Sequence, residues 1–174
     1  MDIVDIFLKH PEKSFHIREL SRMFGKSPTT ISNKLKKLEG EGLLYSENKY
    51  GHLIFSLKEN VMTRRLIRNY NINIIERSGL IEYLEDYYGI IDAMILFGSF
   101  HKGENNEYSD IDLLIISPIS KEPDLKRFEE RIGHKIQLFV HSKKDLSKIR
   151  DKNKELFTNW INGNVIYGYF EALI

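Results

Sequence analysis

Two acidic side chains separated by one residue follow a Gly-Ser pair, and this pattern restricts how the chain can fold. Gly98 and Ser99 end one apolar run, and Asp110 and Asp112 open a second one further along. Because residues i and i+2 of a strand point to the same face, both carboxylates should leave the sheet together, about 7 Å apart along the backbone. The sequence therefore predicts two neighbouring anions at the end of a buried strand.

Two such anions repel each other and need a cation. Mg²⁺ takes oxygen ligands, usually one or two protein carboxylates completed by water and substrate phosphates. A Gly-Ser turn nearby can bring backbone N–H groups to those phosphates. We therefore expect Asp110 and Asp112 to be metal ligands, and Gly98 and Ser99 to contact phosphate.

The composition limits the classes of protein that this chain can form. The 174 residues allow one or two small domains, and the absence of cysteine excludes disulfides and Cys-based zinc sites. Residues 1–58 hold ten Lys and Arg against seven Asp and Glu, whereas the remainder holds sixteen against eighteen. The start is acidic, without a signal-peptide pattern, and no segment approaches the ~20 apolar residues of a membrane span. We expect a soluble cytoplasmic protein without a membrane partner.

Residues 1–58 show three helical patterns followed by two strand-like runs. Ser27 suits the N-cap of the third helix, and Pro28 suits its first position. This order resembles a winged helix-turn-helix domain. The expected helices cover about residues 3–8, 16–24 and 28–39, and the strand-like runs 43–46 and 53–57 flank a turn at 48–51.

The third helix has two different faces. Ile31, Leu35 and Leu38 share the apolar face at helical spacing. The resemblance implies that the opposite face enters the major groove of duplex DNA, with the wing tip touching the backbone. Two alternatives are a solvated helix face and a protein–protein module. No arginine lies on the expected reading face, so strong guanine selection is not expected. The candidate DNA-binding residues are Ser27, Thr29, Thr30, Asn33, Lys36, Lys37, Lys49 and Tyr50.

Residues 59–89 form an expected helical connector. It carries Arg64, Arg65 and Arg68, and a helical pattern that Gly79 interrupts returns from Ile72. The arginines could extend a DNA footprint or meet a partner, but such a run is more often a solvated helix surface.

Residues 90–174 alternate apolar runs with helical patterns, which predicts a mixed sheet flanked by helices. With the winged helix before it, the chain is expected to belong to the α+β class. An apolar stretch at 165–170 should pack on the sheet. The expected order is helix 72–88, strand 90–97, strand 111–116, helix 125–132, strand 136–140 and a last helix that includes residues 156–161.

Three segments of this half carry a second resemblance. Leu96-Phe97-Gly98-Ser99, Lys102-Gly103 and Ser109-Asp110-Ile111-Asp112-Leu113-Leu114 resemble the minimal nucleotidyltransferase domain of the DNA polymerase beta superfamily, over about residues 80–170. The resemblance implies transfer of a nucleoside monophosphate from an NTP, with ATP as the expected nucleotide. Asp110 and Asp112 would be the catalytic residues that hold Mg²⁺, and Gly98 and Ser99 would hold the β and γ phosphates.

Two further residues are candidate nucleotide contacts, each with an alternative. Lys102 could neutralise phosphate charge, or it could be a solvated loop lysine. Ser109 could orient Asp110, or it could cap the loop.

One position departs from the family pattern. The family places a third carboxylate on a neighbouring strand, and Gln137 stands in the matching segment here. An amide oxygen ligates Mg²⁺ weakly, carries no charge and cannot act as a general base. Four groups are candidate substitutes, although the sequence does not place them at the site: Glu129, Glu130, His134 and His141.

Two functions remain open at this point. One is a DNA-binding, transcriptional-regulator-like protein that binds Mg-NTP with weak or no turnover. The other is an active Mg²⁺-dependent nucleotidyltransferase that acts on a hydroxyl of a protein, nucleic acid or small molecule. Minimal domains of this kind often pair with small helical proteins in toxin–antitoxin loci, so a helical partner is a further expectation. Winged-helix regulators often dimerise, which makes a homodimer one expected state.

Overall fold

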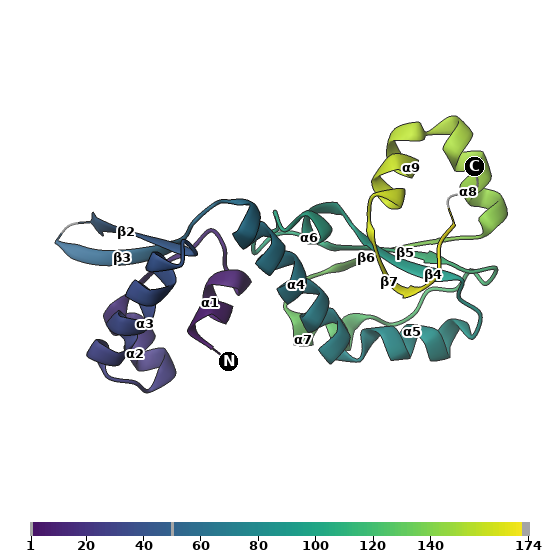
Figure 1. The fold of residues 1–174 in the computed structure, drawn as a ribbon. Coiled ribbons are helices and arrows are strands. Elements are labelled where there is room, and N and C mark those ends of the chain that lie inside the picture. The colour runs from purple at the N-terminus through teal and green to yellow at the C-terminus, as the bar shows by residue number, and fades with distance from the viewer. Residues whose placement is uncertain (1, 50, 172–174) are drawn as a thin grey trace. The chain divides into compact units, whose positions relative to one another are not determined.

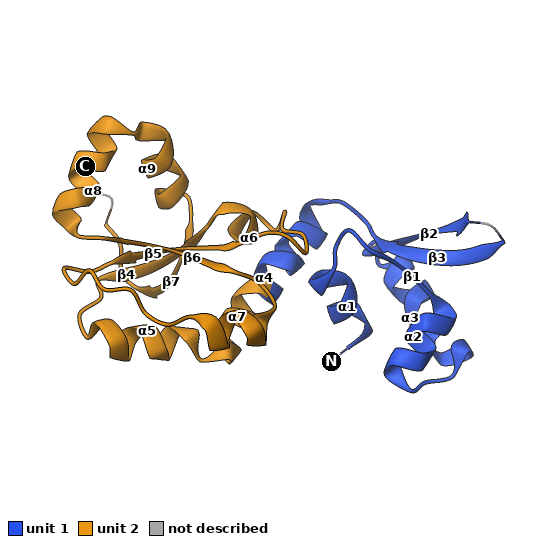
Figure 2. Cartoon of the chain, turned by 180° about the vertical axis from the view of Figure 1, so that it is seen from behind, with its two compact units in different colours: residues 1–70 blue, residues 71–174 orange. Residues whose placement is uncertain are grey.

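The chain forms two compact units in a computed structural model that describes residues 2–49 and 51–171 (Figure 1). The first unit comprises residues 1–70 and the second residues 71–174 (Figure 2). Each unit buries its own set of apolar side chains. None of the helices in the described ranges combines the length and the apolar character needed to span a bilayer.

Helices and a small antiparallel sheet make up the first unit. Its elements are α1 (Ile3–Lys9), β1 (Ser14–His16), α2 (Ile17–Phe24), α3 (Pro28–Gly40), β2 (Leu44–Lys49), β3 (His52–Leu57) and the start of α4 (Val61–Ser78). Strand β3 lies between β1 and β2. Phe7, Leu20, Ile31, Leu35 and Phe55 are fully buried in one core. The β2–β3 hairpin after α3 is the expected wing, with a third strand added to it.

Side chains at two helix starts explain where these helices begin. The Asp2 carboxylate accepts from the Ile3 N–H, while Asp5 accepts from the Asp2 N–H, which forms a capping box at α1. The Ser27 hydroxyl accepts from the Thr30 N–H at 3.1 Å and caps α3, as the sequence predicts.

The second unit is a four-stranded sheet with helices on both faces. Its elements after α4 are α5 (Leu80–Tyr88), β4 (Ala93–Phe97), α6 (Gly98–Lys102), β5 (Ile111–Ile116), α7 (Lys126–Ile132), β6 (Ile136–His141), α8 (Lys143–Lys152), α9 (Lys154–Ile161) and β7 (Asn164–Gly168). The strand order is β6-β5-β4-β7, in which β5 and β6 are parallel and the other pairs antiparallel. This is the mixed sheet that the sequence predicts.

Alternation along β5 separates the two faces of this sheet. Leu113 and Ile115 pack in the core that includes residues of α5 and α7. Leu114 and Ile116 pack on the opposite face with Leu146 of α8 and Trp160 of α9. Figure 1 shows α5 and α7 on one side of the sheet and α8 and α9 on the other. Asp112 is in phase with Leu114, so it belongs to the face that α8 and α9 cover.

Several elements differ from the expectations. The stretch expected only to pack on the sheet is β7, an edge strand paired with β4. Residues 98–102 form the short helix α6 where a loop was expected, and β4 begins at Ala93 rather than at residue 90. Strand β1 was not foreseen, because it is only three residues long; its buried Phe15 packs edge-on against Phe7.

Candidate functional sites

Asp110 and Asp112 lie at the start of β5. Asp112 is the second residue of the strand and is partly buried, whereas Asp110 directly precedes the strand and is exposed. In the sheet, Asp112 is paired with Phe97 of β4 and with Gln137 of β6. The strand pairing therefore brings the ends of three strands to one place, with Asp112 in the middle.

Burial and a neighbouring charge make the ionised form of Asp112 unfavourable. Desolvation is the larger cause and the negative charge of Asp110 the second, and together they raise the pKa of the Asp112 carboxyl. Asp110 directly precedes β5, so its position relative to Asp112 stays a sequence-based prediction. A cation between them would offset both effects.

The turn after β4 is packed against the Asp112 carboxylate. Gly98 has a φ of +68°, and a Cβ at this position would collide with Asp112 Oδ2. Only glycine combines a positive φ with the absence of a Cβ, so only glycine fits here without strain. Ser99 follows in α6 and is partly buried. The backbone at Gly98 thus lies directly beside the Asp112 carboxylate.

Hydrogen bonds fix the segment between α6 and β5. Asn71, 1% exposed, donates from Nδ2 to the Phe100 carbonyl at 2.9 Å and to Asn105 Oδ1 at 2.7 Å. The Ser109 hydroxyl accepts from the Asn106 N–H at 3.0 Å, which is the contact of a loop cap. Because this segment leads into Asp110, the network limits where that carboxylate can lie.

The two candidate nucleotide contacts outside the turn have different surroundings. Lys102 is exposed at the end of α6, and its role in binding phosphate stays a prediction. Ser109 has the contact expected of its loop-capping alternative, and a role in nucleotide binding stays a prediction as well.

Gln137 is exposed and is the register partner of Asp112 on the parallel strand β6. Residues paired in this way point to the same face of a sheet. The third polar group beside the two carboxylates is therefore a neutral amide. Among residues 2–49 and 51–171, no group of three or more His, Asp and Glu side chains is arranged to hold a metal ion.

The four candidate replacements for a third carboxylate lie in different surroundings. Glu129 accepts from the Ile136 N–H at 3.0 Å and pairs with Lys135, and these contacts lower the pKa of its carboxyl. His134 contacts the Ser109 carbonyl at 2.9 Å. His141 ends β6 beside Trp160, where burial lowers its pKa. Glu130 is exposed on α7.

The donor set fits a hard divalent cation. Two carboxylates and one amide are oxygen donors of the kind that Mg²⁺ accepts. The positive charge would also favour the ionised form of Asp112, which burial disfavours. Asp110 and Asp112 would hold the ion.

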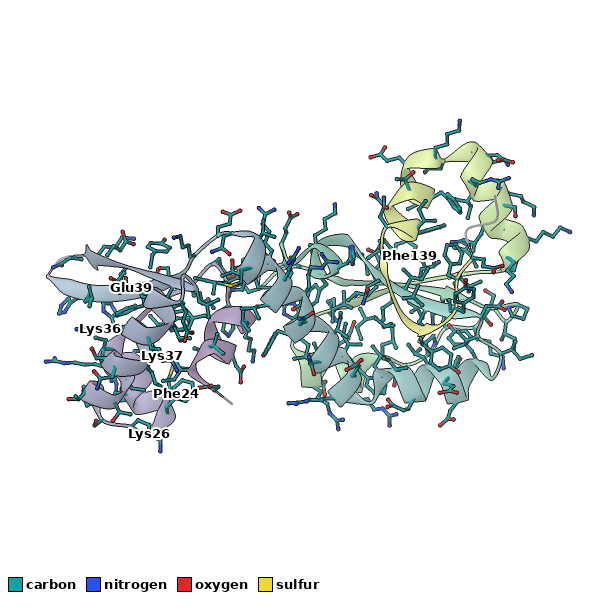
Figure 3. All side chains as sticks on the ribbon, viewed as in Figure 1. Phe24, Lys26, Lys36, Lys37, Glu39 and Phe139 are labelled. Carbon is teal, nitrogen blue, oxygen red and sulfur yellow. The ribbon has the colours of Figure 1, made fainter. Side chains whose placement is uncertain are left out.

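Aromatic side chains lie on the same face of the sheet as Asp112. The rings of Phe97 and Phe139 have centroids 5.4 Å apart, and those of Phe139 and Trp160 lie 6.3 Å apart. Phe139 is labelled in Figure 3. Trp160 is the one tryptophan of the chain, so its fluorescence reports on this region alone.

The exposed face of α3 carries the polar residues that the sequence predicts. Thr29, Thr30, Asn33, Lys36 and Lys37 are all exposed. Figure 3 labels the two lysines on the helix. The face therefore remains available to a ligand of the first unit.

The predicted wing contacts are only partly described. The Lys49 ammonium pairs with Glu47 at 2.9 Å on β2, and both side chains are largely exposed. Tyr50 lies outside the described residues.

Arginines of α2 were not among the predicted contacts. Arg18 and Arg22 are exposed and line two adjoining hollows, one with Pro28 at the start of α3 and one with His52 at the start of β3. The two arginines therefore place positive charge between α3 and the β2–β3 hairpin. Their i, i+4 spacing on an amphipathic helix is the signal that could have identified them.

Comparison with known families agrees with this geometry. Residues 77–163 match the model of the nucleotidyltransferase domain, and residues 3–46 match that of the bacterial regulatory protein, arsR family. The chain belongs to the nucleotidyltransferase domain family and carries a helix-turn-helix regulator domain before it. The predicted fusion is confirmed. Neither the curated proteins nor the solved structures gave a match.

The raised pKa of Asp112 predicts that its charge destabilises the metal-free fold. Folding raises the pKa of the Asp112 carboxyl. Ionisation of Asp112 therefore opposes folding fully at pH values above the folded-state pKa, and this effect disappears at pH values below the unfolded-state pKa of about 3.9. Asp112→Asn should therefore raise the melting temperature at pH 7 without divalent metal. Thermal unfolding across pH measures this, and Asp86→Asn on the exposed surface of α5 is the control. A lower melting temperature for Asp112→Asn at neutral pH would contradict the interpretation.

Proposed function

We propose that this chain is a DNA-binding transcriptional regulator whose nucleotidyltransferase domain binds Mg-NTP with weak or no turnover. The observation that carries the proposal is the register of the sheet. It pairs Asp112 with Gln137 and sets the Asp112 carboxylate against the Gly98 turn.

Each residue of the nucleotide site has an expected role. Asp110 and Asp112 hold Mg²⁺, while the Gly98 and Ser99 backbone amides and the Ser99 hydroxyl bind the β and γ phosphates. Lys102 adds positive charge at the same edge. The bound ion would neutralise phosphate charge and polarise the phosphoryl group. ATP is the nucleotide we expect.

Gln137 is the reason for expecting weak turnover. It cannot take a proton from an attacking hydroxyl, and it adds no negative charge to retain a second cation. Loss of a general base typically lowers a rate by about 10²–10⁴-fold. Binding of Mg-NTP through two carboxylates does not require a general base. The site can therefore bind nucleotide even where it catalyses transfer poorly.

The second candidate is an active nucleotidyltransferase that transfers NMP to a hydroxyl. The contact between Gly98 and Asp112 favours it, because the turn and the carboxylate keep the arrangement that the reaction needs. The two candidates differ in whether labelled nucleotide becomes attached to an acceptor.

In the first unit, we propose that α3 enters the major groove of duplex DNA and that the wing contacts the backbone. Arg18 and Arg22 add phosphate contacts between these two elements. A protein with these ligands works where DNA and NTPs are present, which is the cytoplasm. A homodimer and a small helical partner protein remain part of the proposal.

Nucleotide binding is tested by titrating Mn²⁺ with ATP into the full chain and following Trp160 fluorescence and Mn²⁺ spin resonance. Asp110→Asn and Asp112→Asn should each weaken binding by at least about tenfold, since a lost charge-assisted ligand contributes ~1.5 kcal/mol or more. Asp86→Asn should bind as the unchanged chain does. Equal binding by all of these variants would exclude the proposed site.

Gln137→Asp restores the missing carboxylate. We expect it to raise the rate of NMP transfer from labelled ATP by about 10²–10⁴-fold over the unchanged chain. Gln137→Asn, which has the size of Asp without its charge, should give no gain. Efficient labelling by the unchanged chain would support the active enzyme instead, and no gain with Asp would show that Gln137 is not what limits turnover.

DNA binding is tested with a random-sequence duplex by fluorescence anisotropy at several salt concentrations. Arg18→Gln with Arg22→Gln should weaken binding and reduce the slope of log K against log salt by about 2, since each phosphate contact contributes ~0.9. Lys9→Gln on α1 is the matched control. An unchanged slope would remove these arginines from the interface, and salt-independent binding would contradict the role of α3.

A further inference from the structure

A cavity in the second unit lies between α8, α9 and the chain that follows β7. Its volume is about 140 Å³, and Asp92, just before β4, lines one side. Gly98 directly follows β4, so the cavity is at the other end of that strand from the Asp110–Asp112 pair. The cavity is therefore separate from the proposed nucleotide site.

The interior of this cavity is apolar. Leu146, Phe157, Tyr169 and Phe170 line it, and Leu146 is only 5% exposed. A protein cavity of about 150 Å³ with apolar walls binds benzene. Both size and lining thus match one aromatic ring.

The rim carries two cations and two anions. Lys143 and Arg150 come from one face of α8, and Asp92 and Glu171 come from the segments flanking β4 and β7. Lys143 pairs with Asp92 at 2.6 Å, and the Arg150 Nε donates to Asp151 at 3.3 Å. The Lys143–Asp92 pair is partly exposed, so exchanging it for ligand contacts costs little.

We propose that this cavity binds an aromatic α-amino acid. The ring fills the apolar interior, the carboxylate binds the α8 cations, and the ammonium binds Asp92 and Glu171. A zwitterion matches both signs of charge at the rim, whereas an aromatic acid or an aromatic amine matches one. The proposal does not depend on nucleotide or DNA binding.

Titration of the full chain with L-phenylalanine, followed by calorimetry, tests the proposal. L-phenylalaninamide lacks the carboxylate and phenylpropionate lacks the ammonium, so each should bind at least about tenfold more weakly than L-phenylalanine. Absence of L-phenylalanine binding would overturn the proposal. Equal affinity for either analogue would overturn the assigned charge contacts and with them the amino-acid class.

Variants of α8 locate the site. Arg150→Gln should weaken L-phenylalanine and phenylpropionate by about tenfold and leave L-phenylalaninamide unchanged, because only the first two present a carboxylate. Leu146→Trp should fill the cavity and abolish binding. Lys144→Gln, an exposed neighbour that does not line the cavity, is the control. If Leu146→Trp does not fold, Arg150→Gln alone decides, and unchanged L-phenylalanine affinity in that variant excludes this cavity.

Discussion

The contact between Gly98 and Asp112 determines how the proposed nucleotide site is built. Antiparallel pairing of β4 with β5 sets Phe97 opposite Asp112, so the residue after Phe97 must turn directly over the carboxylate. A positive φ and the absence of a Cβ permit that turn, and any other residue would push the strands or the carboxylate apart. Hydrogen bonds from Asn71 then hold the backbone at Phe100 and the side chain of Asn105. The geometry of the site is thus a property of the sheet and its buried supports rather than of a surface loop.

Charge balance is the reason for proposing nucleotide binding without efficient turnover at this site. Asp112 already lies where burial and Asp110 disfavour its negative charge. A third carboxylate on β6 would increase that repulsion and would need more positive charge to offset it. Gln137 occupies the paired position and avoids this repulsion, at the expense of a general base.

Local patterns predicted most of the fold, and long-range contacts account for the rest. The sequence predicts β5 at residues 111–116 and α3 from Pro28, because alternation and capping are encoded within each segment. The α+β class and the fusion of two families are confirmed. Strands β1 and β7 depend on pairing with distant strands, which no local pattern specifies. Strand geometry predicts that Asp110 and Asp112 lie close together, whereas the register of Asp112 with Gln137 is set by the sheet. The roles of these residues, and of Lys102 and Ser109, stay predictions.

The position of β7 affects the order in which the two units can fold during synthesis. Strand β7 pairs with β4, although β5, β6 and four helices lie between them in the chain. The sheet of the second unit is therefore incomplete until β7 has left the ribosome, and the outer edge of β4 is unpaired until then. The first unit closes its sheet with β3, long before β7 is synthesised. During translation, the helix-turn-helix domain can thus be folded on the nascent chain while the nucleotidyltransferase domain still lacks its edge strand.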